Sequence, residues 1–347
     1  MGDKVSAPFI VRHTADFQAD GKLVYEDVGL DLLESASGID YAFLETFSTE
    51  VEASSLNGID ALICLSPRIS DQSLAQADRL GLIARFGVGY DSVDVDACTS
   101  AGVLLTITTG AVDYSVAEST VTFMLALSHN LTIKDRITRE GRWDERSGYM
   151  GSELRDRTLG IVGLGGIGAR LARMVDSFGM AEVIAFDPYV SPERATKAGV
   201  RLVSLEELMT QSDFVSVNCP LNEETKNLIG AEELGQMKST AYLINTARGG
   251  IVNEQALIDA LRHNRIAGAG LDCHENEPVV ERHPMEDLDN VILSPHAIAW
   301  TNELFRDIGR QTCRQVLELA NGRIPEGAVN PEVVEAQSFR QKLERYG

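Results

Sequence analysis

Three side chains in the second half of the sequence have the types needed for proton transfer beside a bound carboxylate. Arg248 follows the apolar run AYLINTA, Glu277 lies in the loop after AGAGLD, and His296 follows NVILSP. An arginine can grip a planar carboxylate in a bidentate manner, and a histidine can donate or accept a proton near neutral pH. A carboxylate beside the imidazole favours its charged form. Alone, His296 would be interpreted as a packed structural residue, but the three types together predict acid–base chemistry on a small carbonyl acid.

A glycine-rich stretch, GLGGIG from Gly163 to Gly168, lies between a predicted strand (159–162) and a predicted helix (169–178). In this context the glycines permit a tight turn, the approach of a pyrophosphate to the backbone, and close packing of helix on strand. Asp187 ends the next predicted strand, where its carboxylate can accept hydrogen bonds from both adenosine ribose hydroxyls. We therefore predict a dinucleotide site, with NAD favoured because the carboxylate would repel the 2′-phosphate of NADP.

Short apolar runs alternate with segments that are compatible with helices, which is typical of parallel sheets covered by helices. The predicted strands are 61–65, 82–86 and 103–107, then 159–162 and the runs EVIAFD, FVSVNCP, AYLINTA, AGAGLD and NVILSPH. Carboxyl ends of parallel strands meet at one edge of a sheet, so Arg248, Glu277 and His296 should face one crevice. The sequence thus predicts an α/β protein with two doubly wound parallel-sheet domains.

The predicted domain limits follow from these runs and from the chain length of 347 residues, which suits two domains. We assign 1–108 to a substrate domain, 109–296 to a dinucleotide-binding domain of the Rossmann type, and 297–347 to a segment that returns to the substrate domain. Residues 113–143 have apolar side chains at helical spacing and no proline or glycine before Gly141, which predicts one long helix that links the domains.

The net charge of −21 argues against a sequence-independent grip on nucleic acid or on an anionic membrane, because both need basic patches. The expected partner is a small molecule. Five cysteines without a C-x-x-C pair favour a reducing compartment, the cytoplasm. No run of 18 apolar residues occurs, and the first residues lack the pattern of an export signal, so neither membrane spanning nor export is expected.

The order and spacing of GLGGIG, NTARGG, LDCHENEP and SPH, within residues 58–320, resemble the D-isomer-specific 2-hydroxyacid dehydrogenase family, and in particular its phosphoglycerate dehydrogenase and hydroxypyruvate reductase branches. The resemblance implies an NAD-dependent enzyme that moves a hydride between nicotinamide and C2 of a D-2-hydroxy acid or 2-oxo acid. It implies that Arg248 binds the substrate carboxylate and carbonyl, that His296 is the acid and base, and that Glu277 is its partner. A Rossmann domain inserted in a smaller flavodoxin-like domain, and a homodimer, are also implied.

The same resemblance supplies the remaining binding residues. The cofactor should contact the glycine loop and the ends of several strands, at Gly163, Gly165, Gly166, Ile167, Gly168, Asp187, Cys219, Pro220, Thr225, Thr246, Ala247, Asp272 and His296. The substrate should contact Val88 and Gly89 of the GVGYD loop, together with Arg248, His296 and Trp300. The chain departs from the family where PHAIAW replaces the frequent PHIGG, so Ile298 and Trp300 should reshape the pocket wall.

Other interpretations compete with this one. A dinucleotide-sensing module like the C-terminal-binding-protein corepressors would bind NADH with little turnover. Formate dehydrogenases resemble this chain but carry glutamine where Glu277 stands, which disfavours formate oxidation. Phosphite oxidation uses a similar arginine, glutamate and histidine, so these three residues do not distinguish it from the leading interpretation. No metal is expected at Cys273, His274 and His283, because their spacing fits no standard zinc pattern.

Residues with less informative surroundings are assigned to the surface. These are the histidines His13, His129 and His263. Trp143 is left open between a core position and a dimer contact.

Overall fold

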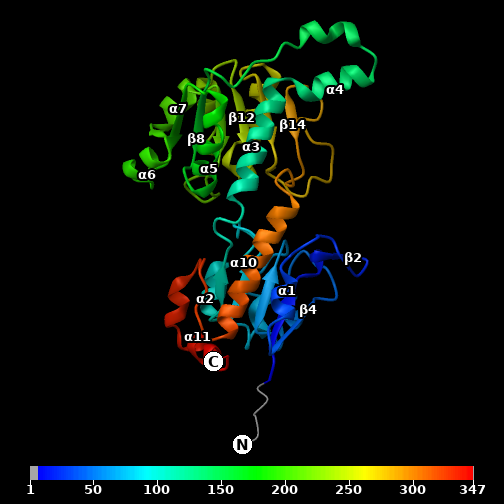
Figure 1. The fold of residues 1–347 in the computed structure, drawn as a ribbon, viewed down its shortest axis with the longest axis vertical. Helices are drawn as coiled ribbons and strands as arrows, with labels where there is room; N and C mark the ends of the chain where they lie inside the picture. The colour runs from blue at the N-terminus through cyan, green and yellow to red at the C-terminus, as the bar shows by residue number, and fades with distance from the viewer. Residues whose placement is uncertain (1–6, 347) are drawn as a thin grey trace, which may run out of the picture. The chain divides into compact units, whose positions relative to one another are not determined.

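The computed structural model describes residues 7–346, and the chain divides into two units (Figure 1). Unit 1 contains the chain up to Val112 together with the segment from Thr301 onward, and unit 2 is Asp113–Trp300. The junctions expected after residues 108 and 296 lie four residues before those of the structure. Among the described residues, no helix is both long enough and apolar enough to cross a membrane.

Unit 1 is built on a five-stranded parallel sheet. Its strands are β1 (Phe9–His13), β4 (Ile39–Phe43), β5 (Ala61–Cys64), β6 (Leu82–Arg85) and β7 (Leu104–Thr106). Their spatial order is β4-β1-β5-β6-β7, and every pairing is parallel. In chain order this is 2-1-3-4-5, the flavodoxin-like arrangement, which confirms the predicted fold. The sequence had indicated only the last three strands.

Helices and a small hairpin surround this sheet. They are η1 (Ala15–Phe17), β2 (Gln18–Ala19), β3 (Lys22–Leu23), α1 (Leu30–Glu34), η2 (Ala53–Leu56), η3 (Ser73–Gln76), α2 (Val95–Ser100), α10 (Asn302–Ala320), η7 (Pro331–Glu335) and α11 (Gln337–Leu343). The orange helix α10 lies with the blue and cyan elements of unit 1 (Figure 1) and packs on α1 and β6. Gly309 allows this approach, because a Cβ there would lie 2.3 Å from the Val28 carbonyl.

His13, at the end of β1, corrects the sequence analysis, which placed it on the surface. The side chain is fully buried, with its ring near those of Phe17 and Phe43. Burial lowers the pKa of His13 to about 4. The surface prediction rested on the polar residues next to His13 in the sequence, whereas the side chains that bury His13 come from η1 and β4. His129 and His263 are exposed, as expected.

Unit 2 contains a seven-stranded parallel sheet. Its strands are β8 (Thr158–Val162), β9 (Glu182–Phe186), β10 (Arg201–Leu202), β11 (Phe214–Val217), β12 (Tyr242–Asn245), β13 (Gly268–Leu271) and β14 (Val291–Leu293). The spatial order β10-β9-β8-β11-β12-β13-β14 reads 3-2-1-4-5-6-7 in chain order, which confirms the predicted Rossmann fold. The order reverses between β8 and β11, and ligands bind at such a switch point.

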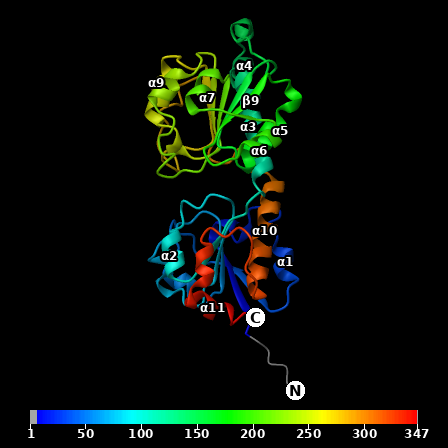
Figure 2. The same cartoon turned by 90° about the vertical axis from the view of Figure 1, so that its left-hand side faces the viewer.

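The helices of unit 2 are α3 (Asp113–Ser128), α4 (Leu131–Arg139), η4 (Trp143–Gly148), α5 (Gly166–Met174), η5 (Asp176–Phe178), α6 (Pro192–Lys197), α7 (Leu205–Gln211), α8 (Ala231–Gln236), η6 (Gly249–Ile251) and α9 (Glu254–Arg262). They cover both faces of this sheet, except for α4 and η4, which lie outside the two layers (Figure 1). One core joins α7, α8 and α9 to the strands, and a second core joins α3, α5 and α6 to the other face. Figure 2 shows α7 and α9 on one side of the strands and α5 and α6 on the other.

The single long helix predicted over 113–143 is wrong, because α3 ends at Ser128 and α4 begins at Leu131. Asn130 separates the two helices in the left-handed conformation, with φ 52°. A helix cannot continue through such a residue, and asparagine tolerates this conformation better than most residues. The Asn130 amide also donates a hydrogen bond to the Met150 carbonyl, at 3.2 Å, which holds the returning segment.

Candidate active site

The glycine loop, the glycine-rich segment from Gly163 to Gly168, joins β8 to α5, and its glycines have different surroundings. Gly163 has φ +97°, and a Cβ there would lie 2.7 Å from the backbone nitrogen of Cys219. A Cβ on Gly168 would lie 2.4 Å from the Gly163 carbonyl oxygen. Gly165 is different, because its Cβ would meet no heavy atom within 4 Å. Packing therefore explains Gly163 and Gly168, whereas the open space beside Gly165 fits a pyrophosphate group that approaches the backbone.

Asp187, one residue beyond β9, lies beside this loop. Its Oδ2 accepts a hydrogen bond from the Leu164 amide at 2.8 Å, and its Oδ1 accepts from Tyr189 and Val190 at 2.9 and 3.2 Å. Each carboxylate oxygen has two acceptor sites, so these three bonds leave one site, on Oδ2, for a ribose hydroxyl. The carboxylate thus fixes the glycine loop, and its selection of an unphosphorylated ribose stays a prediction.

The other predicted cofactor residues follow β11 and β12. Cys219 lies after β11, where burial raises the pKa of its thiol to about 11, so the thiol stays protonated at neutral pH. The Thr225 hydroxyl donates to the Pro220 carbonyl at 2.6 Å and closes that loop. Thr246 lies 3.2 Å from Thr120 of α3, measured between the two hydroxyl oxygens.

Asn245, at the end of β12, was missed by the sequence analysis. Its side chain is buried, donates to the Arg248 carbonyl at 2.7 Å, and accepts from the Ala247 amide at 3.0 Å. Asn245 therefore fixes the turn that presents Arg248. The available signal was a polar amide at the end of a buried apolar strand, where an unpaired amide would be costly.

His296 and Glu277 form the pair that the sequence predicted. Glu277 Oε2 lies 2.7 Å from His296 Nδ1, and Glu277 Oε1 accepts from the His274 amide at 2.8 Å. Burial opposes ionisation of Glu277, but the hydrogen bonds from His296 and from the His274 amide outweigh it and lower the pKa of Glu277. An ionised Glu277 only accepts hydrogen bonds, so Nδ1 of His296 carries a proton and Nε2 is left for a substrate.

Asp272, which follows β13, holds the turn that contains His296. Asp272 is buried, and its Oδ1 accepts from the amides of Ala297 and Ile298 at 2.9 and 3.1 Å. His296 has φ 56°, a left-handed conformation that a non-glycine residue keeps only when its surroundings enforce it. The resemblance had placed Asp272 among the cofactor contacts, and the structure adds this positioning role.

Arg248 lies in the turn after β12, next to the loops that carry Glu277 and His296 after β13 and β14. Its Nη1 donates to the Ala247 carbonyl at 2.7 Å. Gly249 lets this turn meet the neighbouring loop, because a Cβ there would lie 2.0 Å from the His274 carbonyl oxygen. Three adjacent strands of one sheet thus end in the arginine, the glutamate and the histidine.

The remaining predicted substrate residues lie in different units. Val88 and Gly89 are half-buried in the loop after β6 of unit 1, and Trp300 is the last residue of unit 2. The Trp300 side chain is 53% exposed, and its amide donates to the Ala297 carbonyl at 3.0 Å. Contact of these three residues with a substrate stays a prediction.

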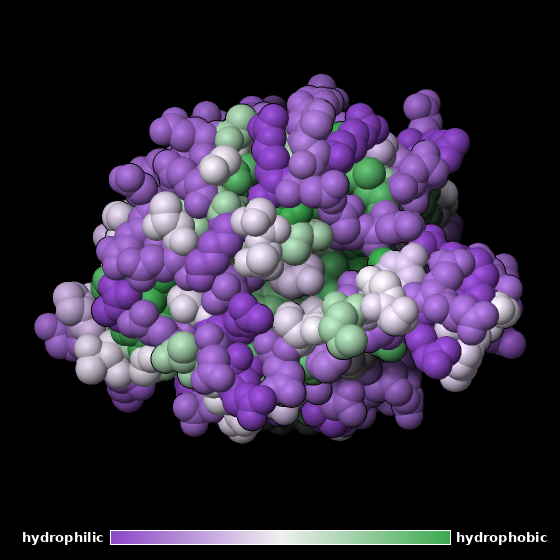
Figure 3. All heavy atoms as spheres, turned by 90° about the horizontal axis from the view of Figure 1, so that it is seen from above, coloured by the Kyte–Doolittle hydropathy of each residue, from purple (hydrophilic) through white to green (hydrophobic). Residues whose placement is uncertain are grey.

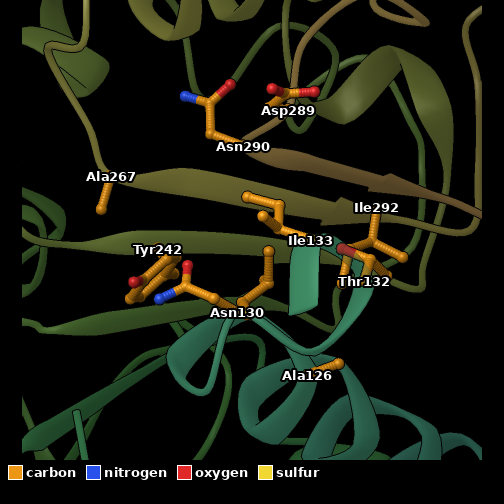
Figure 4. A pocket seen from close by; sticks show the side chains of 10 residues that line it. Ala126, Asn130, Thr132, Ile133, Tyr242, Ala267, Asp289, Asn290 and Ile292 are labelled. Atoms are coloured by element: carbon orange, nitrogen blue, oxygen red, sulfur yellow. The ribbon is translucent and has the colours of Figure 1, made fainter. Parts of the chain in front are cut away.

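A separate cavity of about 110 Å³ lies at the opposite ends of the same strands (Figure 4). Tyr242 begins β12, Ala267 precedes β13, and Asn290 precedes β14, whereas Asn130 and Ile133 come from the α3 to α4 region. The catalytic side chains follow the carboxyl ends of these strands, so this cavity is not the active site.

Comparison with known proteins supports the cofactor site. The NAD-binding domain of the D-isomer specific 2-hydroxyacid dehydrogenase family matches residues 121–297. A solved D-lactate dehydrogenase from Aquifex aeolicus, complexed with NAD and lactic acid, has a TM-score of 0.79 and 28% identity, and the match covers 90% of this chain and 96% of that chain.

Two curated relatives differ in how much of their length is matched. A glyoxylate reductase from Korarchaeum cryptofilum is 38% identical over 282 residues, which cover 80% of this chain and 85% of the relative. A D-3-phosphoglycerate dehydrogenase from Archaeoglobus fulgidus is 37% identical over 281 residues, which cover 81% of this chain and 53% of the relative. The chain therefore spans about half the length of the second relative.

Proposed function

This chain belongs to the D-isomer specific 2-hydroxyacid dehydrogenase family, with NAD as its cofactor, and we propose that it interconverts a small D-2-hydroxy acid and its 2-oxo acid. The observation that carries the proposal is the hydrogen-bonded pair of His296 and ionised Glu277, at 2.7 Å, beside the Arg248 turn. The names of the two relatives give different substrates, so the substrate of this chain has to be identified by experiment.

The residues divide the work of the reaction. When bound, reduced nicotinamide would supply the hydride for C2 of the 2-oxo acid. Arg248 holds the substrate carboxylate and polarises the carbonyl. His296 Nε2 delivers the proton to the developing alkoxide, while Glu277 stabilises the imidazolium through Nδ1; in the reverse direction His296 takes the proton back. A positioned acid or base of this kind contributes roughly 10² to 10⁴ in rate.

The substrate can be identified by NADH oxidation with a panel of 2-oxo acids: glyoxylate, hydroxypyruvate, pyruvate, 2-oxoisocaproate, phenylpyruvate and 3-phosphohydroxypyruvate, each repeated with NADPH. We expect turnover with at least one acid and a preference for NADH, because Asp187 disfavours a 2′-phosphate. The largest acid accepted measures the room left by Ile298 and Trp300. NADH binding without turnover of any acid would instead favour the dinucleotide-sensing module.

We further propose that the chain acts as a homodimer in the cytoplasm. Its five cysteines are free thiols, which suits a reducing compartment. The segment 131–150, which contains α4 and η4, lies outside the two helix layers of unit 2 (Figure 1), and it exposes Leu131, Trp143 and Met150 by 59%, 61% and 83%. Exposed apolar side chains that gather in one segment mark interaction surfaces. Seen from above (Figure 3), hydrophobic side chains also appear among hydrophilic ones near the centre of that face.

The oligomeric state tests this surface. Sedimentation of the wild-type protein should show a dimer, and Trp143→Glu with Met150→Glu should shift it toward the monomer, because charges resist burial in an apolar contact. Tyr189→Glu, at a residue that is 77% exposed outside this segment, is the matched control and should leave the dimer intact. A monomeric wild-type protein would contradict the proposal.

A further inference from the structure

A second group of potential ligands lies beside the catalytic loops of unit 2. Glu254 is the first residue of α9, His274 follows β13, and His283 lies in the segment before β14. One carboxylate oxygen and one ring nitrogen from each histidine lie within 4.8 Å of one another. Three elements that are distant in sequence thus bring two imidazoles and one carboxylate to the same place.

Two ring nitrogens in this group are buried and lack a hydrogen-bond partner among residues 7–346. They are His274 Nδ1 and His283 Nε2. The His274 residue is only 9% exposed, so solvent does not easily satisfy its Nδ1. Leaving such an atom unpaired is costly, and buried polar atoms are usually paired. Both nitrogens therefore point to a ligand that the polypeptide does not supply.

The second nitrogen of His274 shows which atom is available. Nε2 lies 2.9 Å from the Ser294 carbonyl oxygen, and a carbonyl only accepts, so Nε2 carries the proton and Nδ1 presents a lone pair. Metal-bound histidines commonly donate their other ring N–H to a backbone carbonyl in this way. Glu254 is held nearby, because its Oε2 accepts from the Glu275 amide at 3.2 Å.

We propose that Glu254, His274 and His283 bind a divalent transition metal ion, with Zn²⁺ as the best match. Zn²⁺ takes imidazole and carboxylate ligands at about 2.0–2.2 Å in a tetrahedral arrangement, so the ligand atoms converge to about 3.3 Å and water fills the fourth position. His283 must carry its proton on Nδ1, so the Met285 amide, now 3.2 Å from that nitrogen, turns away when the ion binds.

The ion would brace the loops that carry the catalytic pair. The His274 amide donates to Glu277, and the His274 imidazole donates to Ser294, two residues before His296. The metal site would therefore stabilise the loops of the active site without taking part in hydride transfer. It also revises the expectation of no metal, which rested on the spacing of Cys273, His274 and His283. The Cys273 thiol instead donates to the Ala247 carbonyl at 3.2 Å, and the third ligand comes from α9.

The test is calorimetric titration of Zn²⁺ into the full chain after chelator treatment and dialysis. We expect one Zn²⁺ per chain and a higher unfolding temperature of the loaded protein, because a ligand that binds only the folded state stabilises it. His283→Gln and Glu254→Gln should each weaken Zn²⁺ binding by about 100-fold or more, since loss of an outer-shell partner alone costs about 10- to 100-fold. His263→Gln, at an exposed histidine after α9, is the matched control and should bind as the wild type does.

Two results would overturn the proposal. The first is a wild-type protein that takes up no stoichiometric Zn²⁺, which would mean that His274 and His283 satisfy each other or share a water molecule. The second is Zn²⁺ binding that survives in His283→Gln and is lost in Cys273→Ser, which would move the ion to Cys273, Glu277 and His296, whose ligand atoms also lie close together. Thermal unfolding of each variant without metal shows that it is folded.

Discussion

At the scale of single residues, the Glu277 carboxylate decides how His296 can act. It accepts from Nδ1, and its lowered pKa keeps it ionised at neutral pH. Glu277→Gln keeps the size of the side chain and removes the charge. We expect slower 2-oxo acid reduction, by about tenfold or more, because the imidazolium loses its counter-charge. Steady-state rates of both proteins test this, and equal rates would refute the role of Glu277.

His13 gives a second residue-scale prediction, on stability. Its pKa is about 4 in the folded chain, against 6.5 for an exposed histidine, so the unfolded chain binds more protons between these two values. The contribution of His13 to the free energy of unfolding is therefore fully present above pH 6.5. It falls as the pH drops toward 4, by about 3 kcal/mol for this shift. His13→Phe should remove this contribution to the slope of unfolding free energy against pH, measured by urea unfolding at pH 4.5 to 7. An unchanged slope would show that other groups carry it.

At the scale of elements, the glycine loop separates packing from binding. Gly165→Ala should leave the thermal unfolding temperature nearly unchanged, because a Cβ there meets no atom, yet weaken NADH binding by obstructing the pyrophosphate. Gly168→Ala is the matched variant and should lower stability, because its Cβ would lie 2.4 Å from the Gly163 carbonyl. NADH titrations with thermal unfolding measure both effects. Unchanged NADH affinity in Gly165→Ala would exclude this cradle.

The break between α3 and α4 depends on Asn130. Asn130→Ala should destabilise the protein by about 1 kcal/mol, because an alanine in the left-handed conformation is strained, whereas Asn130→Gly should be nearly neutral in backbone strain. Both variants lose the side-chain hydrogen bond to the Met150 carbonyl, so the difference between their stabilities measures the backbone strain alone. Equal urea midpoints would contradict this explanation.

At the scale of the whole molecule, most of the fold and part of the site could be predicted from the sequence. Apart from the two-residue β10, the parallel strands from Ala61 to Leu293 were recognisable as continuous apolar runs, and the Arg248, Glu277 and His296 turns followed from strand ends. Asn245 and the grouping of Glu254 with His274 could not be predicted, because they depend on contacts between distant segments. His13 was misplaced for the same reason, since its burial comes from elements that follow it in the chain.

The central claim is that His296 is the acid and base of an NAD-dependent 2-oxo acid reductase. The most direct measurement compares wild-type protein and His296→Gln for two quantities, the NADH dissociation constant and kcat with the best 2-oxo acid. We predict nearly unchanged NADH affinity and a kcat lower by about 10² or more. A variant that turns over as fast as the wild type, with chemistry rate-limiting, would remove His296 from the mechanism and contradict the account.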